Sequence, residues 1–174
     1  LSKVWERSEK NWPSNNLEKD LPKSMQVFSP SDFGFHNAIL KENGDLAFFD
    51  FEYFGRDDPV KLMADFIWHP GMKLKNLQKI DWLKGAISIF DSDPELVLRF
   101  KSAWPMYGLR WSLILLNEFV NEGWQKRVYA NVNLKYQYEN RLIDQLNKAK
   151  LICEQVQETN MECPYMNDPD EQNI

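Results

Sequence analysis

Apolar side chains recur at helical spacing along most of the chain, and at strand spacing in one short stretch near residue 40. This spacing, together with capping residues and prolines, predicts helices over about residues 1–12, 59–68, 75–90, 94–103, 107–122 and 134–158. The helix over 107–122 is apolar on nearly every face, which is typical of a central helix in a bundle. From residue 159 the chain is polar, acidic and interrupted by prolines, so we expect residues 159–174 to form a flexible tail.

Two strand-like runs, residues 38–42 and 45–51, flank the dipeptide Asn43-Gly44. Asn-Gly favours a two-residue type I′ turn, because both central residues of that turn have positive φ. A two-residue loop pairs Glu42 with Asp45, and the same register places Asn37 opposite Asp50 at the open end of the hairpin. The whole pattern predicts a mainly helical α+β fold with one small β-hairpin.

Composition narrows the class of protein. The 174 residues suffice for one domain, and no apolar run approaches the roughly 18 residues that a membrane span needs. The net charge of −5 comes from acids that follow Lys150, and the nearly neutral remainder argues against a nucleic-acid groove. Two cysteines and two separate histidines are too few for a disulfide framework and wrongly spaced for a zinc site. We therefore expect one cytoplasmic domain, residues 1–158, followed by the tail.

Three polar residues are expected near the open end of the hairpin. Asn37 and Asp50 flank that end, and Asp32 lies in the loop that leads into the first strand. Amide and carboxylate oxygens are ligands that Mg²⁺ accepts, and a further carboxylate nearby can accept the proton of an attacking hydroxyl. Phosphoryl transfer needs this combination of positioning and charge neutralisation.

Each of these residues also has a common structural role. Asp32 could cap a turn or a helix, Asn37 could occupy a turn, and Asp50 could end a strand. Asp50, however, lies within Phe48-Phe49-Asp50-Phe51, where an unpaired carboxylate beside apolar side chains would be costly. The functional interpretation of the three residues together is therefore favoured.

At these residues the sequence resembles the aminoglycoside phosphotransferase and choline kinase superfamily, whose members are protein-kinase-like enzymes. The family's catalytic loop, usually His-x-Asp-x₄-Asn, is matched by Pro30-Ser31-Asp32-x₄-Asn37, and its metal-binding Asp-Phe-Glu is matched by Asp50-Phe51-Glu52. The segment from Gly55 to Pro59 resembles the family's Gly-Asp-Pro segment. The resemblance implies Asp32 as catalytic base, Asn37 and Asp50 as Mg²⁺ ligands, and Asp58 and Asp65 as structural braces.

The same resemblance implies a kinase-like C-terminal lobe, with the catalytic loop and metal hairpin over residues 29–55 and a helical bundle over residues 57–158. It implies a phosphotransferase that uses ATP and Mg²⁺ to phosphorylate a hydroxyl of a small molecule, such as an aminoglycoside, an amino sugar or a choline-like amine. Pro30 departs from the family's usual His, so the rigidity of the loop must come from elsewhere. No glycine loop or lysine strand precedes Asp32, so the chain resembles the C-terminal lobe only. An active kinase would need the ATP-clamping N-terminal lobe from elsewhere in the same gene, and a binding module would not.

Three residues are candidate contacts for the substrate. Glu52 lies beside Asp50, and Trp111 and Glu118 share one face of the helix over 107–122, where an acid beside an aromatic ring suits a cationic amine. The more common roles, Trp111 in the bundle core and Glu118 in an ion pair with Arg110 or a lysine, are favoured for that helix. His36 and His69 are expected outside the site, as a loop residue and a helix-end residue.

Three other interpretations remain open. The same fold could act as a binding or regulatory module without turnover. The acids could serve a metal-dependent phosphoester hydrolase, which the lack of further clustered metal ligands disfavours. The helices could also form a structural scaffold in which the acids have no joint role.

Overall fold

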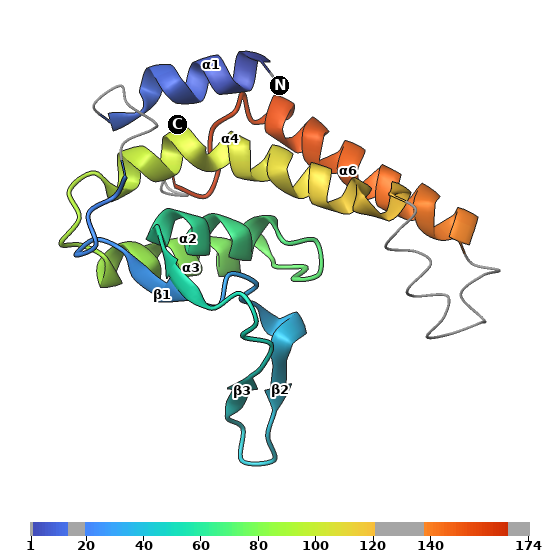
Figure 1. Ribbon diagram of the computed structural model, residues 1–174, viewed down its shortest axis with the longest axis horizontal. Helices are drawn as coiled ribbons and strands as arrows, with labels where there is room; N and C mark the ends of the chain where they lie inside the picture. The colour runs from blue at the N-terminus through green and yellow to red at the C-terminus, as the bar shows by residue number, and fades with distance from the viewer. Residues whose placement is uncertain (1, 14–19, 121–137, 167–174) are drawn as a thin grey trace. The chain divides into compact units, whose positions relative to one another are not determined.

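The computed structural model describes residues 2–13, 20–120 and 138–166 (Figure 1). The chain divides into two compact units, one made of Leu1–Tyr107 with Glu162–Ile174, and the other of Gly108–Met161. The division falls inside a helix, whereas the sequence suggested one lobe over residues 1–158. The described part is mainly helical with small antiparallel sheets, as the predicted α+β class requires.

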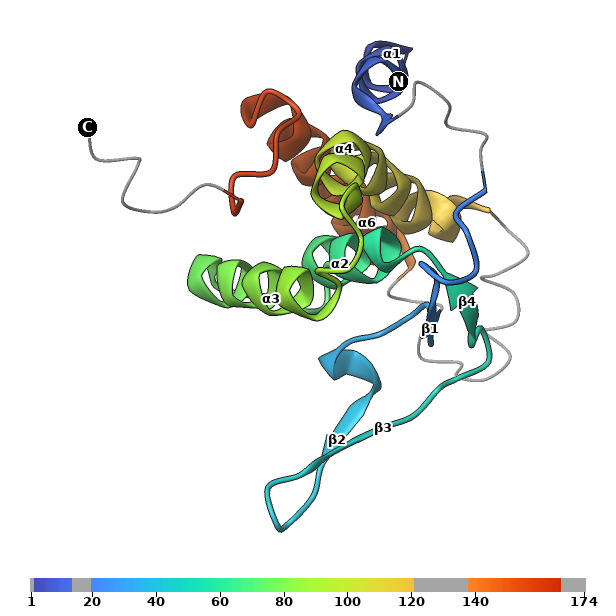
Figure 2. The ribbon, with the colours of Figure 1, turned by 90° about the vertical axis from the view of Figure 1, so that its left-hand side faces the viewer.

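The first unit contains two small sheets, and the hairpin that forms one of them lies in the sequence between the two strands of the other. Strands β1 (Val27–Ser29) and β4 (Gly55–Asp57) pair antiparallel, with Phe28 opposite Arg56 (Figure 2). Strands β2 (Ala38–Leu40) and β3 (Leu46–Phe48) form the predicted hairpin, which extends away from helices α2 and α3 of the same unit (Figure 1). The β1–β4 sheet was not predicted, because three-residue strands separated by more than twenty residues carry no local periodicity.

The predicted register of the hairpin is wrong by one residue. Ala38 pairs with Phe48 and Leu40 with Leu46, so the loop between Lys41 and Asp45 has three residues rather than two. The amide of Gly44 donates to the Lys41 carbonyl at 3.0 Å, and Gly44 then takes a φ of 89°, which is the usual form of a three-residue loop.

The Asn43 side chain explains this choice of turn. Its Oδ1 accepts from the Asp45 amide at 3.1 Å and its Nδ2 donates to the Asp45 carboxylate at 2.8 Å. Asn43 thus closes the turn with its side chain, and only Gly44 adopts positive φ. As a consequence Asn37 lies opposite Phe49, whose amide donates to the Asn37 carbonyl at 3.0 Å, and not opposite Asp50.

Helix α2 (Pro59–Trp68) forms where the sequence predicted it. The Asp58 carboxylate caps it by accepting from the Val60 amide at 2.9 Å, and proline takes the first helical position, where its missing N–H costs nothing. The helix ends at His69, next to Pro70. It forms the core of the first unit with helices α1 (Ser2–Asn11), α3 (Asn76–Ile89) and the N-terminal part of α4 (Leu96–Leu115). The buried apolar side chains of α2, α3 and α4 in this unit are Val60, Met63, Ala64, Phe66, Ile67, Trp68, Leu83, Ala86, Leu96, Phe100, Ala103 and Trp104.

Helix α4 replaces two predicted helices, because it continues through Pro105. A proline inside a helix removes one backbone hydrogen bond and costs about 3 kcal/mol. Here Pro105 is fully buried next to Trp104, whose ring packs at a tilt of 33° against Trp68 with centroids 4.4 Å apart. Burial of these large rings offsets the lost hydrogen bond.

The last described residues pack on the first unit rather than forming the expected flexible tail. Cys163 is buried, the Tyr165 hydroxyl accepts from Lys79 Nζ at 2.9 Å, and the Tyr165 ring contacts Trp104 edge-on. Burial raises the pKa of the Cys163 thiol to about 12, so this thiol stays protonated at neutral pH. Residues 167–174, the rest of the predicted tail, lie outside the described part of the chain.

The second unit contains the end of α4, a 3₁₀ turn η3 (Leu116–Phe119) and helix α6 (Tyr138–Glu158). Its buried apolar residues include Trp111, Leu115, Ala149, Ile152 and Val156. The ends of the two helices predicted over 107–122 and 134–158 fall partly on residues 121–137, which lie outside the described residues. No helix in the described ranges is both long enough and apolar enough to cross a membrane.

Candidate active site

Asp32 lies in the loop between β1 and a 3₁₀ turn over Phe35–Asn37. The preceding residue, Ser31, has a φ of 63°, a left-handed conformation that costs a non-glycine residue of order 1 kcal/mol. Two contacts hold it there: the Ser31 amide donates to Ser29 Oγ at 3.1 Å, and Lys61 Nζ donates to Ser31 Oγ at 3.0 Å. The loop is therefore fixed by neighbouring side chains, while the Asp32 side chain stays 44% exposed.

Lys61 connects this loop to helix α2. Its Nζ lies 2.9 Å from Asp57 Oδ2 and 3.5 Å from Asp65 Oδ2, in addition to Ser31. Asp65 lies on helix α2 and is buried. Lys61 thus links this buried carboxylate to the loop. These contacts supply the rigidity that Pro30, whose side chain has no hydrogen-bonding group, cannot supply.

The structure brings Asn37 and Asp32 together. The Asn37 side chain is buried, and its Nδ2 donates to the Asp32 carbonyl at 2.9 Å and to Asp32 Oδ2 at 3.2 Å. Because the amide is planar, its Oδ1 points away from the donor side and keeps its lone pairs for another ligand. Asn37 thus orients the Asp32 carboxylate and offers an oxygen on its other side.

Asp50 follows Phe49, the cross-strand neighbour of Asn37, and has a φ of 65°. A left-handed aspartate directly after a strand stops the alternation of side chains and turns the chain away from the ladder. Such outliers collect at functional sites, where the surrounding structure holds them in place. The Asp50 side chain is exposed, as is that of Glu52 in the turn that follows.

Three acids act electrostatically on the hydroxyl of Tyr53. The pKa of Tyr53 is raised, first by the negative charge of Glu52 and its hydrogen bond to that carboxylate, and further by the charges of Asp50 and Asp32. The charges of Asp32 and Asp50 thus both act on the Tyr53 hydroxyl.

Two histidines, both predicted to lie outside the site, contact Asp32. His36 Nε2 is 3.0 Å from Asp32 Oδ1, and His69 Nε2 is 3.9 Å from the same oxygen. Burial, and secondarily the charge of His36, lower the pKa of His69 to about 4, while the Asp32 charge opposes the shift. His36 is four residues from Asp32, a spacing that hinted at a contact. His69 is 37 residues away, and nothing local indicates it.

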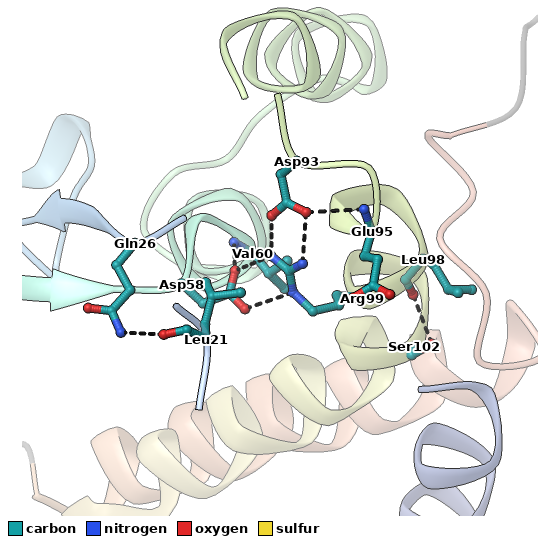
Figure 3. A network of polar contacts seen from close by, with 9 residues as sticks. All are labelled: Leu21, Gln26, Asp58, Val60, Asp93, Glu95, Leu98, Arg99 and Ser102. Carbon is teal, nitrogen blue, oxygen red and sulfur yellow. Dashed lines mark hydrogen bonds and ion pairs between the residues drawn. The ribbon is translucent and has the colours of Figure 1, made fainter. Parts of the chain in front are cut away.

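Asp58 has contacts that connect three parts of the first unit (Figure 3). Besides capping α2, it accepts from Arg99 Nε and Nη2, each at 3.1 Å, while Arg99 also donates to Asp93 at 2.7 Å. Burial opposes a charged Arg99, but the hydrogen bonds with Asp93 and Asp58 outweigh it and raise the pKa of the guanidinium. Hydrogen bonds from Arg99 likewise overcome burial and lower the pKa of Asp93.

Trp111 and Glu118, the other candidate substrate contacts, belong to the second unit. Trp111 is buried, and Glu118 forms an ion pair with Arg141 at 2.9 Å. Their contacts within this unit are those of structural residues. A role at the substrate stays a prediction.

The donor groups at the hairpin fit a magnesium ion. Asn37 and Asp50 offer amide and carboxylate oxygens, the hard ligands that Mg²⁺ takes together with water and phosphate oxygens. A second cluster, formed by Asp32, His36 and His69, has one candidate ligand atom per residue within 4.8 Å of the others. Its two imidazoles would suit a transition metal better than magnesium.

No known protein family, curated protein or solved structure matches the chain.

Proposed function

We propose that this chain carries the base and the metal ligands of an ATP- and Mg²⁺-dependent kinase that phosphorylates a hydroxyl of a small molecule. The observation that carries the proposal is the Asp32 carboxylate, which is partly exposed and held by Asn37 at the base of the hairpin that bears Asp50. The resemblance over residues 29–65 supports the same assignment. Trp111, Glu118 and Glu52 remain candidate contacts for a cationic acceptor such as an amino sugar or a choline-like amine.

In the proposed reaction the acceptor oxygen forms a bond to the γ-phosphorus of ATP, and the bond from that phosphorus to the β–γ bridging oxygen breaks. The hydroxyl proton passes to Asp32, and ADP leaves. When bound, Mg²⁺ neutralises the charge of the phosphates, and Asn37 and Asp50 are the residues that would hold it. The hydrogen bond from Asn37 fixes the carboxylate, so that its remaining lone pairs are directed to the open side of the loop.

Phosphotransfer from Mg-ATP to a panel of amino sugars and amino alcohols tests the proposal. The product is identified by mass spectrometry and ADP release is followed for rate. We expect Asp32→Asn to lower kcat by at least about 100-fold, since it removes the base while keeping the size of the side chain. Asp45→Asn, at an exposed carboxylate in the hairpin loop, is the matched control and should keep the full rate. Equal activity of the wild-type protein and Asp32→Asn would remove Asp32 from its role.

A second candidate function depends on whether a further segment covers the hairpin, whose apolar side chains are exposed. Ile39, Leu40, Leu46 and Phe49 are all exposed, and Leu40 is 69% exposed. An isolated two-stranded hairpin is marginally stable in water. Four exposed apolar side chains on it therefore favour the presence of a further segment that packs over them. We propose an N-terminal lobe of the same gene as that segment.

Without such a lobe, the chain would act as a nucleotide-binding or regulatory module with the same site. Titration calorimetry with Mg-ATP separates the two functions. Binding without phosphotransfer to any acceptor supports the module, and turnover supports the kinase. Binding that Asp50→Asn leaves unchanged would contradict the magnesium site in both.

A further inference from the structure

The imidazole rings of His36 and His69 lie stacked beside Asp32. Their centroids are 3.9 Å apart and their planes differ by 2°, so each ring covers the face of the other. Both Nε2 atoms are turned to Asp32 Oδ1, at 3.0 Å for His36 and 3.9 Å for His69. The two side chains are 23% and 16% exposed, against 44% for Asp32, so the pair forms the more buried wall of the site.

The backbone defines the tautomer of His69. The Gly71 amide donates to His69 Nδ1 at 3.1 Å, so Nδ1 holds no proton. A neutral ring then carries its proton on Nε2, the atom that faces Asp32. The lowered pKa of His69 is consistent with a neutral ring.

The surroundings of His36 point to the same tautomer. Its Nε2 is within hydrogen-bonding distance of a carboxylate oxygen, which can only accept, so Nε2 must donate. Its Nδ1 is buried, has no hydrogen-bond partner among the described residues, and lies against the backbone of Gly34. A Cβ added at Gly34 would approach Nδ1 to 2.7 Å, so this ring position depends on the glycine.

A metal ion in the same cluster would need the opposite protonation. Coordination through both Nε2 atoms moves each ring proton to Nδ1, and metal-bound histidines normally donate that proton to an acceptor. At His69 the proton would meet the Gly71 amide, which is itself a donor. At His36 it would be buried where the described part of the chain provides no acceptor. The surroundings of the two rings therefore favour donation to Asp32 over metal binding.

We propose that His36 and His69 are positioning residues for Asp32: as Nε2–H tautomers they both face Oδ1, His36 donating a hydrogen bond and His69 holding the His36 ring by stacking. With Asn37 on Oδ2, the carboxylate is then held on both oxygens. This inference rests on the proposed function for its catalytic meaning. The tautomers themselves can be measured without any activity.

Long-range ¹H–¹⁵N NMR of the histidine rings in the full chain is the direct test, because the ring ¹⁵N shifts distinguish the two tautomers. At neutral pH we expect both rings as Nε2–H. In Asp32→Asn the His36 Nε2–H signal should shift strongly while the tautomer of His69 is retained. Gly34→Ala should displace the His36 ring and so remove its hydrogen bond to Asp32, with a similar shift of the Nε2–H signal. An Nδ1–H tautomer at either ring of the wild-type protein would overturn the proposal.

Zinc chloride is the probe for the competing metal site. Calorimetric titration of the full chain should show no stoichiometric binding, and the His36→Ala titration should match that of the wild-type protein. Tight one-to-one binding that His36→Ala and His69→Ala each abolish would overturn the positioning role in favour of a metal site.

Kinetics then connect the pair to the reaction. His36→Ala should lower kcat by roughly 10- to 100-fold with little change in the KM for Mg-ATP, because only the orientation of the base is lost. His36→Gln, which can still donate a hydrogen bond, should recover part of kcat. A lower kcat in His36→Ala with no recovery in His36→Gln would contradict the hydrogen-bonding role. If no acceptor is phosphorylated, the kinase proposal fails while the tautomer measurement still decides the inference.

Discussion

At the scale of the residue, the chemistry of the site centres on one carboxylate with an unusual number of nitrogen neighbours. Asp32 accepts from Asn37 on Oδ2 and faces His36 and His69 on Oδ1, while Lys61 holds the preceding residue in a left-handed conformation. A free surface aspartate rotates among several rotamers, and each fixed donor removes some of that freedom. The carboxylate is thereby held in one orientation.

His69 makes the stability of the fold depend on pH in a defined direction. Its pKa in the folded chain is about 4, whereas an unfolded histidine titrates near 6.5, so between these values only the unfolded chain takes up the proton. The contribution of neutral His69 to the unfolding free energy is complete above about pH 6.5 and is lost as the pH falls to about 4. The loss amounts to roughly 3 kcal/mol. His36 and Asp32 are the titratable neighbours of this ring.

Urea unfolding at several pH values measures this effect. His69→Phe keeps an aromatic ring for the stack but removes the titration, so its unfolding free energy should fall less steeply between about pH 6.5 and 4. Other groups titrate in both proteins and cancel in the difference. Parallel pH profiles for the two proteins would show that His69 does not carry the effect.

At the scale of the element, the hairpin loop illustrates how a side chain selects a turn. Asn-Gly suits a two-residue loop, in which both residues have positive φ. It also suits a three-residue loop, in which only Gly44 does. The two hydrogen bonds between Asn43 and Asp45, one in each direction, stabilise the longer loop. The register that results pairs Asn37 with Phe49, and the left-handed conformation of Asp50 then places the second acid.

Two glycines form a matched pair for testing this loop. Neither Gly44 nor Gly85 has an atom within 4 Å of an added Cβ, but Gly44 has a φ of 89° and Gly85 lies in helix α3. Gly44→Ala should lower the unfolding free energy by about 1–2 kcal/mol, since a side chain disfavours the left-handed conformation. Gly85→Ala should raise it by about 0.5–1 kcal/mol through helix propensity. Urea denaturation of both variants measures the signs, and a stabilising Gly44→Ala would contradict the loop assignment.

At the scale of the whole molecule, an ion-pair network connects elements that are distant in sequence. Arg99 of α4 binds Asp58 at the start of α2 and Asp93 in the connection between α3 and α4 (Figure 3). The Arg99 and Asp93 side chains are 5% and 7% exposed. Removing one partner of a buried pair leaves the other charge uncompensated, so this network holds the end of α2 that follows the site.

Arg99→Met should lower the unfolding free energy by about 3–5 kcal/mol, because it leaves Asp93 and Asp58 without their cation. Arg7→Met is the matched control in the same unit: Arg7 pairs with Glu162 at 2.9 Å, but on an exposed surface, where such pairs contribute about 0–1 kcal/mol. Chemical denaturation compares the two variants. Equal losses would mean that the burial of the Arg99 network has no energetic consequence.

The sequence by itself determined the features that depend on neighbours along the chain. Helix α2 follows from its cap, its proline and its apolar spacing, and the hairpin follows from two strand-like runs around Asn43-Gly44. The candidate site was chosen from the residue types and spacing of Asp32, Asn37 and Asp50, which lie close together in the sequence around one predicted hairpin. Local pattern, however, does not fix a loop length when two turns suit the same residues.

Only the tertiary structure decided the contacts between residues far apart in sequence. The β1–β4 pairing, the stack of His69 on His36 and the binding of Arg99 to Asp58 join segments whose separation leaves no periodic signal. The continuation of α4 through Pro105 is of the same kind, because burial of the surrounding rings outweighs a local preference to end the helix. The contacts that hold Asp32 are therefore of two kinds. Asn37 and His36 belong to its own loop, whereas His69 comes from a distant segment.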